Sequence, residues 1–126
     1  MIEILKQHPK AAEVMKNYYI NLMIESAQDL PDHFKEFLQD KGLEMSNIAE
    51  MMETAPRNLF DVFDKYDIII SITYDRNTNK FCYLVNEYQE KDQFDTRKEA
   101  DRDAVKTALT LLEAKLNALE KTNEDS

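Results

Sequence analysis

Apolar residues recur at steps of three and four along the first half of the chain, and this spacing is typical of amphipathic helices. The longest such run extends from Pro9 to about Asp29. Pro9 suits a first helical position, because its missing N–H costs nothing there. Residues 2–7 predict a short helical turn before it. The first half is therefore expected to consist of short helices that pack around the rest of the chain, rather than to form a four-helix bundle.

Prolines, a glycine and a serine set the expected ends of the shorter helices. One of these helices is expected to begin at Pro31. It is expected to end at Gly42, because glycine readily takes the left-handed conformation that follows a helix. Ser46 is a good N-cap for the next, which breaks at Ala55-Pro56. Pro56 then opens another. The apolar positions of that last helix are Leu59, Phe60, Val62, Phe63 and Tyr66.

The pattern changes at residue 68, where β-branched and aromatic residues begin to alternate with polar ones. Two such runs, Ile68–Tyr74 and Phe81–Tyr88, flank a segment rich in turn-forming Asp, Asn and Thr. The runs therefore predict an antiparallel β-hairpin.

The pleat predicts the register of that hairpin, because a slip by one residue moves every side chain to the other face. A turn centred on Asn77-Thr78 gathers the apolar residues on one face, whereas an odd-numbered loop sets Ile72 against Leu84. We expect the even loop, with these facing pairs: Tyr74 and Phe81, Ile72 and Tyr83, Ile70 and Val85.

The second face of the hairpin is too apolar to be fully solvated and too polar for a deep core. Its expected residues are Ile69, Ser71, Thr73, Cys82, Leu84, Asn86 and Tyr88. Either the N-terminal helices or another chain would cover it. We expect coverage by the chain's own helices, since a domain usually has two packed layers.

A long helix follows the hairpin. Thr96 and Glu99 fit a capping box, in which the threonine hydroxyl accepts from the N–H of Glu99 and the glutamate reaches back. Phe94, just before it, is expected either in a short third strand or as an anchor at the start of the helix. The helix is expected to run to about Glu120, and residues 121–126 are expected to form a polar disordered tail.

The long helix carries two rows of apolar residues. Together these rows are wider than the apolar stripe that a helix needs to pack against one neighbour. A row of mostly small residues suits close packing on the sheet: Ala100, Ala104, Ala108, Leu111 and Ala118. The second row, named here the leucine row, consists of Val105, Leu109, Leu112, Leu116 and Leu119. Its steps of four and three match a coiled-coil seam, so its neighbour is either the N-terminal half or the same helix in a second copy.

These elements predict an α+β fold for residues 1–120 as a single domain. N-terminal helices precede a two- or three-stranded antiparallel meander, and the long C-terminal helix packs on the sheet. The surplus apolar surface gives a candidate surface for a protein partner or a homodimer. Its residues are Ile69, Leu84, Tyr88, Leu109, Leu112, Leu116 and Leu119.

The formal net charge of −9 is spread along the chain, with −5 over residues 1–66 and −4 over residues 67–126. Such a charge repels phosphates, which argues against direct nucleic-acid binding. It also motivates an alternative function, an acidic nucleic-acid mimic that inhibits a DNA- or RNA-binding protein. The chain has a single glycine, and this excludes glycine-rich phosphate loops and dinucleotide fingerprints.

No residue is assigned a catalytic, cofactor-binding or metal-binding role, and we expect a protein that is not an enzyme and carries no cofactor. The most metal-like group gathers around one helix start, where the helix dipole alone favours acids. Its members are Asp29, Asp32, His33, Glu36 and Asp40. Cys82 is the only cysteine, and on a strand it is expected to be a core or interface residue. With no apolar run long enough for a membrane span and no signal peptide, we expect a cytoplasmic protein.

One segment carries a resemblance. Phe81–Val85, followed by Phe94–Ala100 and a helix with Ala104 and Ala108, resembles the C-terminal part of small uncharacterised proteins from prophages and mobile elements of gut bacteria. The resemblance covers about 40 residues and implies no catalytic residue. The function hypothesis is a small non-enzymatic protein-interaction module, of the kind that serves as an accessory factor of a mobile element.

Overall fold

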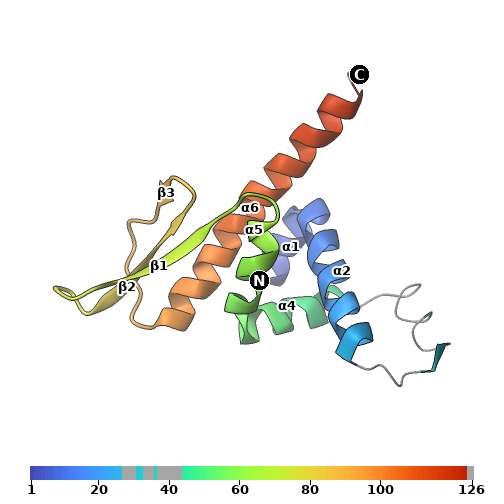
Figure 1. Ribbon diagram of the computed structural model, residues 1–126. Helices are drawn as coiled ribbons and strands as arrows, with labels where there is room; N and C mark the ends of the chain where they lie inside the picture. Colours follow the sequence, from blue (N-terminus) through green and yellow to red (C-terminus); the bar gives the residue numbers. More distant parts are fainter. Residues whose placement is uncertain (27–30, 33–35, 37–43, 125–126) are drawn as a thin grey trace.

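The long C-terminal helix lies between a small antiparallel sheet and the N-terminal helices, in an α+β arrangement (Figure 1). The computed structural model describes residues 1–26, 31–32, 36 and 44–124. The sheet has the strand order β1-β2-β3. The predicted architecture of helices, meander and long packed helix is confirmed.

The N-terminal helices follow the predicted boundaries closely. They are α1 (Ile2–Gln7), α2 (Pro9–Ser26), α4 (Met45–Thr54), the 3₁₀ turn η1 (Pro56–Leu59) and α5 (Phe60–Asp64). The expected helix between Pro31 and Gly42 lies largely outside the described residues. Proline at the start of α2 and of η1 costs no hydrogen bond, which confirms the expected breaks before both.

The expected N-cap at Ser46 is wrong. Helix α4 starts at Met45, and Glu44 is its N-cap residue in an extended conformation. The Glu44 carbonyl accepts from the N–H groups of Asn47 and Ile48, at 3.0 and 3.1 Å. No side-chain cap hydrogen bond forms at this helix start, and Ser46 is an exposed residue of its first turn.

The predicted register of the hairpin is confirmed. Strand β1 (Ile70–Asp75) pairs with β2 (Lys80–Val85), and the pairs include Tyr74 with Phe81, Ile72 with Tyr83 and Ile70 with Val85. The even-numbered loop of residues 76–79 joins them, and Asn79 takes a left-handed conformation with φ 58°. Asparagine tolerates that conformation better than most residues, which explains its place at the turn.

The second strand is shorter than predicted, because the chain turns at residues 86–87. Asn86 has φ 54°, and β3 (Tyr88–Gln89) returns beside β2 with Tyr88 opposite Val85. A left-handed residue ends an extended run and reverses the chain in a two-residue loop. Phe94 forms an isolated bridge with Phe81, so it both extends the sheet and leads into the long helix.

Helix α6 (Arg97–Glu124) starts at the predicted cap, where the N–H of Glu99 donates to Thr96 Oγ1 at 3.2 Å. It continues past the expected end at Glu120, so residues 121–124 are helical instead of belonging to the expected tail. No glycine or proline interrupts this stretch, and Lys121 in the last turn suits the negative end of the helix dipole. Residues 125–126 lie outside the described residues.

One hydrophobic core joins α6 to both of its neighbours. Tyr83 and Val85 of the sheet are buried in it, together with Leu109 and Leu112 of α6. The N-terminal helices contribute Leu5, Ala11, Ala12, Met15, Tyr19, Ile48, Ala49, Met52, Leu59, Val62 and Phe63. The neighbour that the leucine row needs is therefore the chain's own N-terminal half, over Val105 to Leu112.

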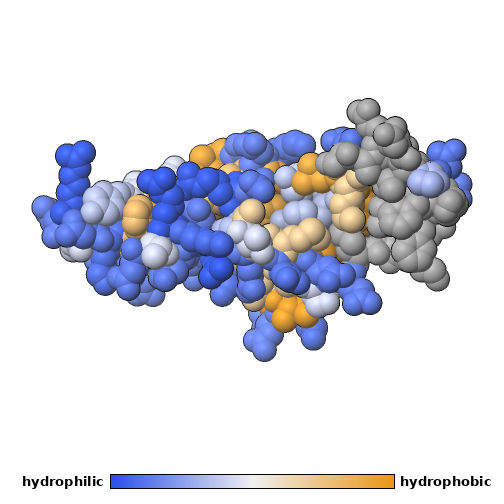
Figure 2. Space-filling view, turned by 90° about the horizontal axis from the view of Figure 1, so that it is seen from below, coloured by the Kyte–Doolittle hydropathy of each residue, from blue (hydrophilic) through white to orange (hydrophobic). Residues whose placement is uncertain are grey.

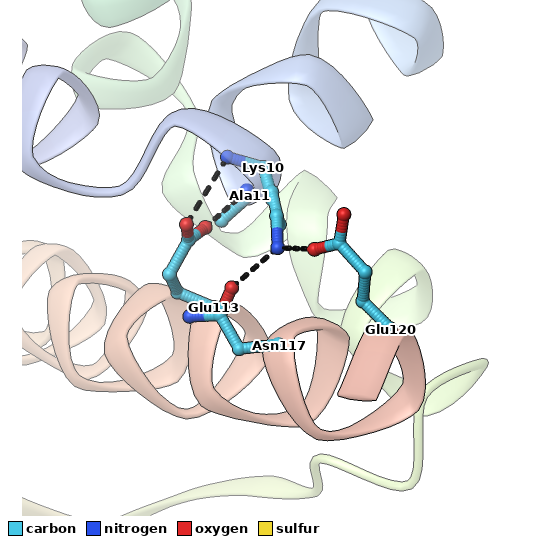
Figure 3. Close-up of polar contacts among 5 residues, drawn as sticks. All are labelled: Lys10, Ala11, Glu113, Asn117 and Glu120. Carbon is cyan, nitrogen blue, oxygen red and sulfur yellow. Dashed lines mark hydrogen bonds and ion pairs between the residues drawn. The ribbon is translucent and has the colours of Figure 1, made fainter. Parts of the chain in front are cut away.

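Two buried carboxylates of α6 bind the N-terminal helices. The buried Glu113 carboxylate accepts from the backbone N–H of Lys10 at 3.3 Å and of Ala11 at 2.7 Å (Figure 3). The buried Asp101 carboxylate accepts from Nε and Nη2 of Arg57, at 3.3 and 3.2 Å. Glu113 supplies a cap to the first turn of α2 from the other end of the chain.

Candidate interaction surface

The structure separates the seven residues of the predicted interaction surface into three places. Leu109 and Leu112 are fully buried in the core, so neither is available to a partner. Leu116 is half-buried, and Leu119 is 60% exposed near the end of α6. The first part of the leucine row therefore lies in the core, and only its last residue, Leu119, lies on the surface. The remaining residues, Ile69, Leu84 and Tyr88, belong to the sheet.

Tyr88 lies on the opposite face of the sheet from Leu84, which corrects its expected position. Directly paired residues of antiparallel strands share a face, and Tyr88 pairs with Val85 on the side of α6. Its hydroxyl donates to Glu90 Oε2 at 3.0 Å, and the Tyr83 hydroxyl on the same face lies 3.1 Å from that oxygen. The turn at residues 86–87 causes the change, since the expected strand ran on without reversing.

The outer face of the sheet is open in the described part of the chain. Ile69 is 51% exposed and Leu84 is 37% exposed, and the Ser71 and Thr73 side chains between them are also exposed. Helix α6 packs on the face that carries Tyr83 and Val85. The described helices therefore do not provide the cover that the sequence led us to expect for this face.

Strand β1 also has a free edge, because it pairs only with β2 among the described strands. Backbone groups of an antiparallel strand point to alternate sides. On β2, Phe81 bonds through N–H and C=O to Phe94, and Tyr83 accepts from Glu90 N–H. The β2 residues that alternate with them, Cys82 and Leu84, therefore bond to β1, at Thr73 and Ser71. The backbone N–H and C=O groups of three β1 residues consequently point away from the sheet: Ile70, Ile72 and Tyr74.

The sequence of this edge lacks the lysine and proline that often protect edge strands. Natural edges carry lysine, proline, a bulge or a covering element, which prevent pairing with other chains. No charged residue and no proline occurs between Asp67 and Asp75, and four of the seven residues there are isoleucine. The run has high β-propensity. A free edge beside an open face with Ile69 and Leu84 is the strongest binding feature of the described structure.

A second, smaller feature lies at the end of α6, which projects beyond the other elements (Figure 1). Val14 of α2 lines a shallow groove there with Leu116 and Leu119. The charged rim is engaged internally, because Lys10 Nζ donates to Asn117 Oδ1 at 2.5 Å and pairs with Glu120 (Figure 3). The apolar residues of this groove are few, and the sheet edge offers the longer contact.

The inner face of the sheet carries a polar cluster that the sequence did not reveal. The buried Tyr83 hydroxyl lies 2.5 Å from Asp103 Oδ2 and 2.8 Å from Thr107 Oγ1. Burial and the neighbouring Asp103 carboxylate raise the pKa of Tyr83 far above its usual value, so the hydroxyl stays protonated and donates. The only sequence signal is the four-residue spacing of Asp103 and Thr107 on α6. The cluster ties the sheet to the helix.

Glu90 is the titratable group of this cluster with a lowered pKa. The Asp92 N–H, the Tyr88 hydroxyl and the Lys91 N–H donate to it, and with the neighbouring Tyr83 hydroxyl they hold its pKa below the ordinary 4.5. Because the pKa is lower folded than unfolded, the stabilisation is complete above pH 4.5 and is lost as the pH falls through the folded pKa. A carbon-detected NMR titration should place the Glu90 midpoint below the ordinary 4.5. A midpoint at or above 4.5 would contradict these contacts.

The hydropathy of the surface residues shows where the surface is polar. In the view from below, the left end, which holds the hairpin tip, is mostly hydrophilic, and hydrophobic areas gather toward the middle (Figure 2).

Among residues 1–26, 31–32, 36 and 44–124, no group of three His, Cys, Asp or Glu residues could hold a metal ion. The predicted acidic cluster falls mostly outside these ranges, at Asp29, His33 and Asp40. Within the described helices, none has the length and apolar character needed to cross a membrane.

The arrangement can offer main-chain hydrogen bonds along β1 and apolar side-chain contacts on the outer face. Comparison with known proteins adds nothing to these observations: no family model, no curated protein and no solved structure matches the chain.

Proposed function

We propose that the protein is a non-enzymatic interaction module that binds a protein partner by strand addition at β1. One observation carries the proposal: within the described residues β1 pairs along one edge only, and its other edge lies beside an open face with Ile69 and Leu84. In strand addition, main-chain hydrogen bonds give affinity and pockets for alternate side chains give specificity. The main-chain groups lie on β1, and the apolar side chains of Ile69 and Leu84 lie beside it on the outer face.

The rest of the fold supports this role by holding β1 in place. Asn86 accepts from the Ile69 N–H through Oδ1 at 2.7 Å and donates to the Asp67 carbonyl through Nδ2 at 3.1 Å. Lys115 of α6 donates to the same carbonyl at 3.3 Å and to that of Tyr66 at 2.9 Å. The start of β1 is therefore fixed to β2 and to α6, so a partner strand meets an ordered template.

The alternative function, an acidic nucleic-acid mimic, requires carboxylates aligned on one surface. Several carboxylates instead serve separate internal contacts in different elements. Asp101 binds Arg57, Glu113 caps α2 and Asp95 pairs with Lys80 at 3.0 Å. These three carboxylates are therefore engaged within the fold and do not contribute to a phosphate-like array.

A substitution at Tyr74 tests the proposal with a matched control. Tyr74→Pro removes the outward N–H, which proline can do on an edge strand without breaking the ladder to β2. Tyr74→Ala removes the same side chain and keeps the N–H. The tagged protein is expressed in its native host, crosslinked and purified. We expect the wild type and Tyr74→Ala to retain the same partner and Tyr74→Pro to lose it. Equal retention by all three would refute strand addition.

A further inference from the structure

The free edge of β1 is complementary to itself. When two copies of β1 run antiparallel with Ile72 facing Ile72, Ile70 of each copy faces Tyr74 of the other. This register uses every outward backbone group on the edge, because the residues that point outward are Ile70, Ile72 and Tyr74. Each facing pair of this kind exchanges two N–H···O bonds. A shift by two residues in either direction leaves outward groups without a partner.

The side chains also match in that register. Ile70 facing Tyr74 is a β-branched and aromatic pair, and Ser71 facing Thr73 is a hydroxyl pair; both kinds stabilise antiparallel strands. Asp75 faces Ile69 and Arg76 faces Ile68, so no two like charges are placed directly opposite each other. This matters because each copy carries a net charge of −9, and like charges facing each other would oppose pairing.

We propose that the partner at β1 is a second copy of this chain, and that the two copies form one continuous sheet about a two-fold axis at Ile72. The inference rests on the proposed function and names its partner. Paired residues share a face, so the α6 helices of both copies lie on the same side of the sheet. The open outer faces, with Ile69 and Leu84 of each copy, lie together on the other side.

The size of the contact sets its expected strength. A contact along the edge of one six-residue strand buries less surface than a standard interface, which buries roughly 1,600 Å² in total. We therefore expect a concentration-dependent dimer with a dissociation constant of roughly micromolar order rather than a permanent one.

Charges at Ser71 and Thr73 test the register, because both side chains are exposed on the outer face and face each other across the axis. The double variant Ser71→Lys with Thr73→Lys places like charges opposite each other at two symmetric positions. The matched variant Ser71→Lys with Thr73→Glu places opposite charges there. Both variants change the same exposed positions, so their effects on the monomer fold are comparable, and circular dichroism checks this.

Analytical ultracentrifugation over a range of concentrations gives the result. We expect the wild type to dimerise, the Lys/Lys variant to weaken the dimer about tenfold or more, and the Lys/Glu variant to dimerise about as well as the wild type. A wild type that stays monomeric to millimolar concentration overturns the inference. A dimer that responds equally to both variants also overturns it, because the contact then lies elsewhere, such as at the end of α6.

Failure of this inference is distinguishable from failure of the proposed function. A monomeric wild type whose host partner is still lost in Tyr74→Pro and kept in Tyr74→Ala leaves strand addition intact and excludes the second copy. A monomeric wild type whose host partner ignores both Tyr74 variants overturns both.

Discussion

Leu109→Ala is expected to lower the free energy of unfolding by about 2–5 kcal/mol, the range for removing a fully buried leucine side chain from a core. Leu109 is completely buried in the core that joins α6 to the N-terminal helices. Its loss leaves a cavity between elements that are far apart in the sequence. Chemical denaturation followed by circular dichroism measures the change.

Leu119→Ala is the matched control, because it makes the same chemical change in the same row of the same helix. Leu119 is 60% exposed, and surface substitutions usually change stability by less than about 0.5 kcal/mol. Similar losses in both variants would contradict the division of the leucine row into a buried part and an exposed end.

Glu113→Ala is expected to destabilise the fold by about 2 kcal/mol, which is the upper end for loss of a helix cap and typical of a hydrogen bond to a charged group. The Glu113 carboxylate accepts from the first-turn N–H groups of Lys10 and Ala11, and it is 9% exposed (Figure 3). Without it, these donors of α2 lose their partner in a partly buried place. Thermal and urea denaturation both report the loss.

Glu120→Ala serves as the control for Glu113, since it removes an exposed carboxylate from the same helix. Glu120 forms a surface ion pair with Lys10, and exposed pairs contribute about 0–1 kcal/mol. If Glu120→Ala were as damaging as Glu113→Ala, the buried cap would not be the main polar link between α6 and α2. Hydrogen exchange of the Ala11 amide adds a local readout, and it should accelerate only in Glu113→Ala.

The hairpin register was predictable because local physics determines it. Alternation of Ile70 and Ile72 with polar residues fixes which face is buried, and the even loop follows from placing Tyr83 and Val85 on that face. The capped start of α6 at Thr96 was predictable for the same reason, since its donor and acceptor are three residues apart.

The turn at Asn86 was missed because its signal is weak. Asn86-Glu87 lacks the glycine that marks most two-residue hairpin loops, and the apolar run continues across it to Tyr88. Once Asn86 takes its left-handed conformation, Tyr88 changes face and Glu90 reaches the Tyr83 hydroxyl. One turn residue thus moved Tyr88 out of the candidate surface.

The cap from Glu113 and the cover of the leucine row could not be predicted from local patterns. Glu113 meets Ala11 across 102 positions of sequence, so no spacing rule connects them. For Leu109, the row's spacing fitted either a helix of the same chain or a second copy. Only the packing of α2 and η1 against α6 decides between these neighbours. The free edge of β1 likewise emerges only when the strand order is known.

Amide hydrogen exchange along β1, measured at several protein concentrations, tests the central claim most directly. Ser71 and Thr73 bond to β2, so their amides should be protected at every concentration. The amides of Ile70, Ile72 and Tyr74 point outward, and we predict that their protection rises with concentration as the edge pairs with a second copy. If these three amides exchange quickly and equally at all concentrations, the free edge of β1 is not a self-association site.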